Sequence, residues 1–160
     1  MNVKIRDLFN VYQLALEVKK SSFYSINIDF LWFCDDIMDN SKDVIQPIME
    51  QIDTLKKWYS DTLTEIQTKY SKKDEFGNVS TIADDNGNNI MQFENDDNRL
   101  KYAEEYKSLT NTFAAKDSEL GTKLDVYIDL DALYKIKRDI LPKLDINPMI
   151  FESLKKFVER

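Results

Sequence analysis

Two turn sequences lie ten residues apart between two stretches with helical periodicity. Gly77-Asn78 and Asn86-Gly87 both combine glycine with asparagine, the residue types that accept the positive φ of tight turns. Residues that favour strands stand on both sides of the second turn: Val79, Thr81 and Ile82, then Ile90, Met91 and Phe93. The sequence therefore predicts a β-hairpin over about residues 74–95, inserted between two helices.

The helical stretch before the hairpin is long. From Phe30 to Tyr70, apolar residues recur every three or four positions, which predicts one helix of about 40 residues or two helices in line. Pro47 removes one backbone donor, so a kink or break is expected near residues 43–46, with Asn40-Ser41 able to cap a second helix. The helix after the hairpin is expected to run from Asp96 to about Lys116.

The two ends of the chain supply smaller elements. The sequence predicts the following: an amphipathic helix in residues 3–20, a half-buried strand from Leu124 to Leu130, a short helix over 132–141 capped by Asp131, and a last helix from Pro148 through Val158. The predicted fold class is α+β and mainly α. It consists of a long antiparallel helical pair with a protruding β-hairpin and a small C-terminal strand and helix unit. At 160 residues, the chain is expected to form a single domain.

Composition excludes several kinds of function. The chain has no histidine, which removes every histidine-dependent nucleophile, proton relay and metal site. Its one cysteine, Cys34, cannot form an intrachain disulfide. The net charge of −7 argues against a general phosphate-binding surface. The longest apolar run, Phe30 to Cys34, is far too short to cross a membrane, and no secretion signal is recognisable.

Three groups of carboxylates could in principle form sites. A calcium loop with Gly87 in its sixth position would need ligands at Ile82 and Phe93, so that motif fails. Asp125, Asp129 and Asp131 could hold magnesium or perform acid–base chemistry, but a solvated strand face with a helix cap is favoured. The acidic ridge of Asp35, Asp36, Asp39 and Asp43 is interpreted as a solvated helix face rather than a site for a basic partner. The sequence thus predicts no catalytic residue, metal site or cofactor.

Aromatic residues suggest a different kind of site. Phe30 and Phe33 share a helix face, whereas Trp32 points away from it, so Trp32 is either covered by C-terminal elements or an exposed anchor for a partner. Together with this tryptophan, the hairpin supplies the predicted partner-binding residues: Trp32, Phe76, Val79, Ile82, Asp84, Asp85, Ile90 and Phe93.

Residues 69–160 resemble a family of small uncharacterised proteins encoded by tailed bacteriophages. The resemblance lies in Lys69 to Asn78, the second turn Asp85 to Asn88, the stretch Leu124 to Leu130, and the closing Ile146-Asn147-Pro148 with Ile150 to Val158. It implies a phage origin and the same order of a long helix, a doubly turned segment, a second helix, a strand and a short terminal helix. The family's role is unassigned, so the resemblance implies little chemistry.

These observations lead to two hypotheses. The first is a non-enzymatic phage structural or assembly protein, such as a ring, connector or capsid accessory subunit. It would contact other virion proteins and copies of itself, be made in the host bacterial cytoplasm and reside in the virion. The alternative is a small acidic inhibitor that binds a host or defence protein. Neither hypothesis involves direct contact with nucleic acid or membrane, nor a small-molecule substrate.

Overall fold

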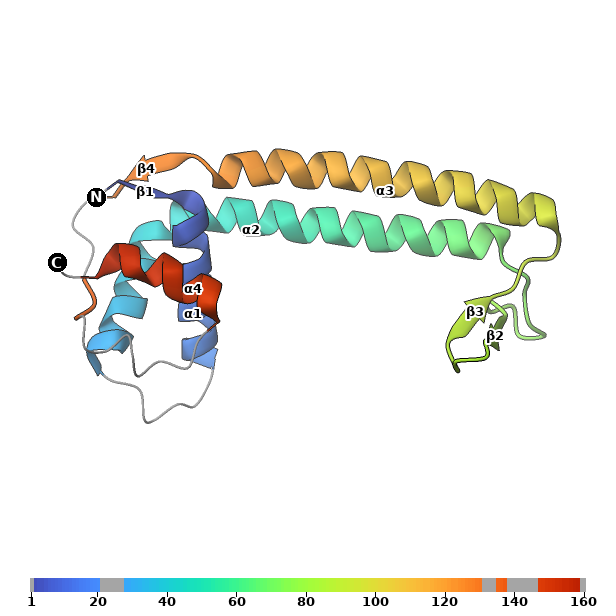
Figure 1. The fold of residues 1–160 in the computed structure, drawn as a ribbon, viewed down its shortest axis with the longest axis horizontal. Helices are drawn as coiled ribbons and strands as arrows, with labels where there is room; N and C mark the ends of the chain where they lie inside the picture. Colours follow the sequence, from blue (N-terminus) through green and yellow to red (C-terminus); the bar gives the residue numbers. More distant parts are fainter. Residues whose placement is uncertain (1, 21–27, 131–134, 138–146, 159–160) are drawn as a thin grey trace. The chain divides into compact units, whose positions relative to one another are not determined.

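The computed structural model describes residues 2–20, 28–130, 135–137 and 147–158 (Figure 1). This part of the chain is mainly helical with small antiparallel strand pairs, as the predicted α+β class requires. In chain order its elements are β1 Asn2–Lys4, α1 Ile5–Lys20, α2 Ile28–Tyr70, β2 Thr81–Ala83, β3 Asn89–Met91, α3 Asp96–Leu124, β4 Tyr127–Asp129, α4 Pro148–Leu154 and the 3₁₀ helix η2 Lys155–Phe157.

Helix α2 continues through Pro47 as one helix, so of the predicted kink or break the break does not occur. The two residues proposed as a cap act inside the helix instead. Asn40 donates from Nδ2 to the backbone oxygen of Asp36, and the Ser41 hydroxyl donates to that of Ile37. Proline removes one backbone hydrogen bond, and the neighbouring Ile45 and Ile48 keep the helix in place because both are buried.

The chain divides into two compact units. Unit 1 comprises Met1–Gln51 and Glu119–Arg160, and unit 2 comprises Ile52–Ser118. Helices α2 and α3 each contribute residues to both units, because the unit boundaries fall within them. The single domain expected from chain length stays a prediction.

The core of unit 1 joins α1, the first half of α2 and the C-terminal helices. Leu8 and Val11 of α1 are buried, as predicted from the periodicity of residues 3–20. Phe33 has no exposed surface and lies between Phe30 (6.0 Å between ring centroids) and Phe157 (5.9 Å). Helix α4 packs on α1, as Figure 1 shows. The aromatic cluster thus connects α2 with the end of the chain.

Helix α3 extends eight residues beyond its predicted end at Lys116 and reaches Leu124. Gly121 lies inside it and does not end it. The predicted strand 124–130 is therefore wrong at its start and shrinks to β4, which pairs antiparallel with β1 so that Val3 faces Ile128. Val126, an apolar residue of the predicted half-buried strand, exposes 52% of its surface. Alternation of apolar and polar residues describes a strand only where a partner strand is present, and β1 was not predicted.

The C-terminal helix begins as predicted. Asn147 caps it by accepting a hydrogen bond from the Met149 amide (2.9 Å), and Pro148 occupies its first turn. Regular helix ends at Leu154 and continues as η2. The predicted helix over 132–141 is wrong at residues 135–137, where Ile136 forms a parallel bridge with Val158. The other residues of that prediction, with the Asp131 cap, lie outside the described residues.

Unit 2 is built on side chains from the last part of α2 and from α3. Its buried cluster contains Ile66, Tyr70 and Leu109, with Trp58, Tyr59, Leu63, Phe93 and Tyr102 packed against it. Tyr59 contacts Phe113 (4.7 Å between ring centroids), and Tyr70 contacts Glu105. The later residue of α2 thus contacts the earlier residue of α3, so the two helical segments of unit 2 run antiparallel.

The contrast between adjacent aromatic residues of α2 gives a test of the unit 1 core. Phe33→Ala should lower the free energy of unfolding by about 3 to 5 kcal/mol, because it removes a fully buried ring between two others. Trp32→Ala should change it by roughly 0.5 kcal/mol or less, because Trp32 is 56% exposed. Urea denaturation followed by circular dichroism measures both, and equal losses would contradict the described packing.

Candidate functional site

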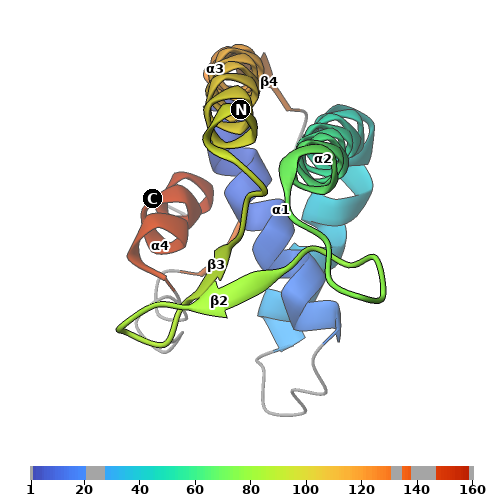
Figure 2. The same cartoon turned by 90° about the vertical axis from the view of Figure 1, so that its right-hand side faces the viewer.

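The candidate site is the hairpin segment, here defined as residues 71–93, which connects α2 to α3. Strands β2 and β3 pair antiparallel, with Thr81 facing Met91, Ile82 facing Ile90 and Ala83 facing Asn89. Figure 2 shows the two strands side by side. Gly77 and Gly87 have φ values of 82° and 80°, the left-handed region that favours glycine. The predicted hairpin and its two glycine turns are confirmed.

The two loops of the hairpin segment repeat one structure. Each has the sequence Asp-x-x-Gly-Asn, at residues 74–78 and 84–88. In the first loop, Asp74 Oδ1 accepts from the amides of Phe76 (2.9 Å) and Asn78 (2.8 Å). In the second, Asp84 Oδ1 accepts from the amides of Asn86 (2.9 Å) and Asn88 (2.7 Å). Each aspartate side chain thus holds its loop in place by accepting hydrogen bonds from the backbone amides of that loop.

These hydrogen bonds affect the acidity of both aspartates. The pKa of Asp74 is lowered, chiefly by the hydrogen bond from the Asn78 amide, and that of Asp84 is lowered, chiefly by the one from the Asn88 amide. An N–H donor stabilises the ionised carboxylate that accepts from it. The ionised carboxylates of Asp74 and Asp84 therefore help to hold the two loops in their observed structure.

Three strands meet at the centre of the hairpin segment. The Lys72 amide donates to the Gln92 oxygen (2.8 Å), the Gln92 amide to the Ser80 oxygen (2.9 Å), and the Ser80 amide to the Lys72 oxygen (2.9 Å). Antiparallel bridges flank this ring, from Ser71 to Phe93 and from Lys73 to Val79. Residues 71–73 thus form a third strand-like stretch, which the sequence analysis missed. The repeated Asp-x-x-Gly-Asn motif was the signal that could have revealed two hairpins in series.

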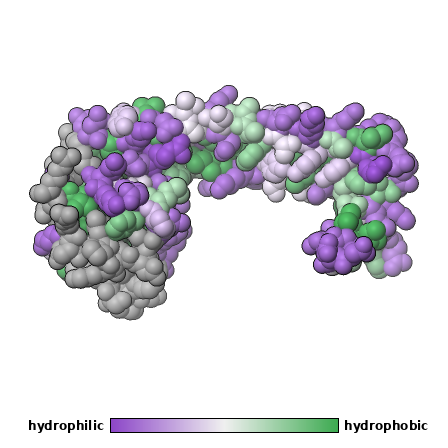
Figure 3. All heavy atoms as spheres, viewed as in Figure 1, coloured by the Kyte–Doolittle hydropathy of each residue, from purple (hydrophilic) through white to green (hydrophobic). Residues whose placement is uncertain are grey.

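Large apolar side chains are exposed on this framework. Phe76 exposes 80% of its surface, Ile82 51% and Ile90 48%. Figure 3 shows hydrophobic side chains among hydrophilic ones on the hairpin segment. Such exposure is common at protein–protein contact sites.

The other predicted contact residues of the hairpin segment have different surroundings. Asp85 is exposed, whereas Val79 and Asp84 are half-buried. Phe93 packs on Tyr102 (5.3 Å between ring centroids) and joins the unit 2 core. Phe93 therefore anchors the hairpin segment to the helices, and the apolar side chains available to a partner are those of Phe76, Ile82 and Ile90.

Trp32 belongs to unit 1 and not to the hairpin segment. Its side chain is 56% exposed, while Phe30 and Phe33 beside it are buried. Of the two alternatives left by the sequence, the structure agrees with the exposed tryptophan.

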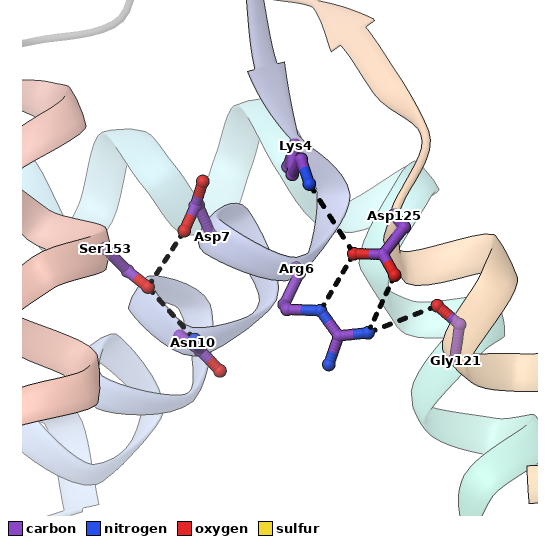
Figure 4. A network of polar contacts seen from close by, with 7 residues as sticks. All are labelled: Lys4, Arg6, Asp7, Asn10, Gly121, Asp125 and Ser153. Carbon is purple, nitrogen blue, oxygen red and sulfur yellow. Dashed lines mark hydrogen bonds and ion pairs between the residues drawn. The ribbon is translucent and has the colours of Figure 1, made fainter. Parts of the chain in front are cut away.

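Asp125, one of the carboxylates considered for metal or acid–base chemistry, has structural partners in unit 1. Asp125 precedes β4 and receives hydrogen bonds from Arg6 Nε (3.1 Å) and Nη2 (3.2 Å), as Figure 4 shows. Lys4 Nζ lies 3.8 Å from the same carboxylate. The pKa of Asp125 is lowered, chiefly by the Arg6 hydrogen bond. Asp125 therefore joins the start of α1 to the end of α3.

A second polar cluster in Figure 4 connects α1 with α4. Asn10 Nδ2 donates to Ser153 Oγ (3.0 Å), and Ser153 Oγ donates to Asp7 Oδ1 (3.1 Å). A serine beside a carboxylate resembles part of a catalytic arrangement, but no histidine exists in the chain to act as the base between them. We therefore interpret this cluster as a hydrogen-bonded contact between α1 and α4.

Unit 2 also contains a groove of about 380 Å³ between α2 and α3. Trp58, Ile66 and Leu109 contribute its apolar lining. At its edge Lys69 donates to Glu105 (2.7 Å) and lies over the Tyr70 ring, while Lys116 lies over the Trp58 ring at 4.6 Å. Lys69 and Glu105 of the groove lining thus bind each other.

The described residues contain no group of three or more aspartate, glutamate, cysteine or histidine side chains that could hold a metal ion. None of the helices within the described ranges has both the length and the apolar character needed to cross a membrane.

Comparison with protein-family models, with curated proteins and with solved structures finds no match for this chain.

Glycine substitutions test the described loops. Gly87→Ala should speed amide exchange at Ile82 and Ile90 by about tenfold, since a left-handed residue with a side chain costs about 1 to 2 kcal/mol. Gly121→Ala is the matched control. It lies within α3 with open space around the added Cβ, so it should stabilise the protein by about 0.5 to 1 kcal/mol. If both substitutions destabilised the protein, or both stabilised it, the assignment of Gly87 to a left-handed turn and Gly121 to a helix would be refuted.

Acid should loosen the hairpin segment before it affects a loop held by uncharged groups. Because the folded pKa values of Asp74 and Asp84 are lowered, their stabilising effect is present above the ordinary aspartate pKa of about 3.9 and is lost as pH falls through the folded values. Carboxyl carbon shifts measured by NMR should titrate below the ordinary midpoint. Asn88→Ala, which removes one donor to Asp84, should move the Asp84 midpoint upward and leave that of Asp74 unchanged. A midpoint of about 3.9 for both aspartates in the parent protein would contradict the loop hydrogen bonds.

Proposed function

We propose that this chain is a non-enzymatic structural or assembly protein that acts through protein–protein contacts, with the hairpin segment as its contact element. The supporting observation is the exposure of Phe76, Ile82 and Ile90 on a backbone held in place by two Asp-x-x-Gly-Asn loops. A preorganised apolar surface loses little conformational entropy when a partner covers it. The proposal keeps the predicted architecture, in which a long antiparallel helical pair presents the hairpin as a projection.

The tailed-phage context of the proposal comes from the resemblance of residues 69–160. In this context the chain is a ring, connector or capsid accessory subunit of the virion, made in the host cytoplasm, whose partners are other virion proteins and copies of itself. Repeated subunits of this kind need recurring contact surfaces and no catalysis. The hydrogen bonds from Arg6 to Asp125 support that proposal, because they give a structural role to a carboxylate that was considered for acid–base chemistry.

Particle composition tests this function. Quantitative mass spectrometry of purified particles of the phage that encodes the chain should find it at a fixed copy number. Absence from particles, together with capture of a host protein by the free chain, would contradict the proposal and favour the alternative of an acidic inhibitor.

A pair of variants tests the contact element. Phe76→Ser combined with Ile82→Ser should reduce incorporation into particles at least tenfold while leaving the circular dichroism spectrum unchanged, since both side chains are exposed. Leu100→Ser is the matched control, because Leu100 is 61% exposed but lies on α3 outside the hairpin segment. Equal incorporation of the double variant and the control would remove the hairpin segment from the proposal.

A further inference from the structure

In the hairpin segment, the backbone partners of the central strand, residues 78–84, lie along one edge of that strand. The Asp74 amide donates to the Asn78 oxygen, the Ser80 amide to Lys72, and the Asp84 amide to Asn88. In an antiparallel ladder, the backbone groups of successive residues point to alternate edges. The even-numbered residues of this strand therefore point toward residues 72–74 on one side of the ring and 88–92 on the other.

The odd-numbered residues of the same strand point to the opposite edge. These are Val79, Thr81 and Ala83, and among the described residues the backbone hydrogen bonds that join this strand to residues 72–74, 88 and 92 involve its even-numbered residues instead. Thr81 and Ala83 are exposed. Proteins usually protect such an edge with proline, lysine or a covering element, and residues 79–83 contain neither proline nor lysine. This edge, residues 79, 81 and 83, is here called the open edge.

We propose that the open edge pairs antiparallel with the open edge of a second copy of this chain, around a two-fold axis at Thr81. This inference rests on the proposed function and names the partner of its contact element. In this register Thr81 faces the partner's Thr81, and Val79 faces the partner's Ala83. All three residues of each copy then use both backbone groups, which makes six interchain hydrogen bonds.

The register follows from the distribution of unpaired groups. An axis at Ile82 would pair Thr81 with the partner's Ala83 but would place Val79 opposite the partner's Asp85, within a loop. That arrangement makes four strand hydrogen bonds in place of six. The axis at Thr81 is the arrangement that satisfies the whole open edge.

Side chains and charges fit a second copy. The axis at Thr81 places Asp84 opposite the partner's Asn78 and Asp85 opposite the partner's Gly77, so no carboxylate directly faces another. Ile82 becomes the diagonal neighbour of the partner's Ile82 on the same face, within reach of contact. This covers an apolar side chain that is 51% exposed in the single chain.

Net charge makes the association sensitive to salt. Each copy carries a net charge of −7, so two copies repel each other at long range. Dissolved salt screens that repulsion and affects backbone hydrogen bonds much less. Pairing at the open edge should therefore strengthen as the salt concentration rises.

Disulfide trapping tests the register. Thr81→Cys places two thiols at directly opposed positions about 5.5 Å apart between Cα atoms, which suits a disulfide. The native Cys34 is buried in unit 1 and should not compete. Asn89→Cys is the matched control, since Asn89 is exposed on β3, on the other side of β2 from the open edge. Under mild oxidation, T81C should form covalent dimers at least tenfold faster than N89C, and faster in high salt than in low salt. Equal rates for the two variants would overturn the proposal.

A backbone variant checks the hydrogen bonds. Thr81→Pro removes an N–H that points to the open edge, away from the described partners of the strand, so the hairpin should persist, as edge strands tolerate proline at such positions. Sedimentation should show self-association weakened at least tenfold, with amide exchange at Ile90 unchanged. If T81P keeps its hairpin and associates as tightly as the parent protein, the proposal fails. If T81P loses its hairpin, the comparison of T81C with N89C decides.

The outcomes separate this inference from the proposed function. A chain present in particles at fixed copy number without the T81C dimer would overturn only the pairing. A T81C dimer formed by a chain that is absent from particles would overturn the virion role and leave the pairing intact.

Discussion

The ring of backbone hydrogen bonds among Lys72, Ser80 and Gln92 determines what the hairpin segment can do. It joins two hairpins to the same edge of one central strand, and the bridges and backbone hydrogen bonds by which other described residues reach this strand lie on that edge. Backbone N–H and C=O groups must find partners in the protein, in water or in another chain. The pattern of internal pairing therefore defines the surface that is available to a second molecule.

The parts of this segment that could be predicted from sequence are those set by single residues. Glycine beside asparagine marked both turns, and both glycines have positive φ. The pairing of residues 71–73 could not be predicted, because neither strand propensity nor turn chemistry states which edge a neighbouring strand will use. Ile82 and Ile90, by contrast, were named from sequence as partner-binding residues, and both are exposed.

Helix ends were predicted less well than helix interiors. The periodic stripe of α2 was correct, and of the kink or break expected at Pro47 the break does not occur, with buried isoleucines on either side of the proline. At the end of α3, Gly121 and the alternation after it suggested a strand, whereas the helix continues to Leu124. A residue's intrinsic preference is a weak guide where packing with distant residues decides, and β1 lies more than a hundred residues from β4 in the sequence.

The placement of the two tryptophans has a spectroscopic consequence. Trp32 lies in unit 1 with more than half of its surface exposed, and Trp58 lies in unit 2 with the Lys116 ammonium over its ring. Each unit thus carries one tryptophan, and the two tryptophans have different surroundings. Replacing either tryptophan with phenylalanine would leave one tryptophan as a reporter of a single unit. The unfolding of the core around Phe33 and that of the helical segments of unit 2 could then be followed separately by fluorescence.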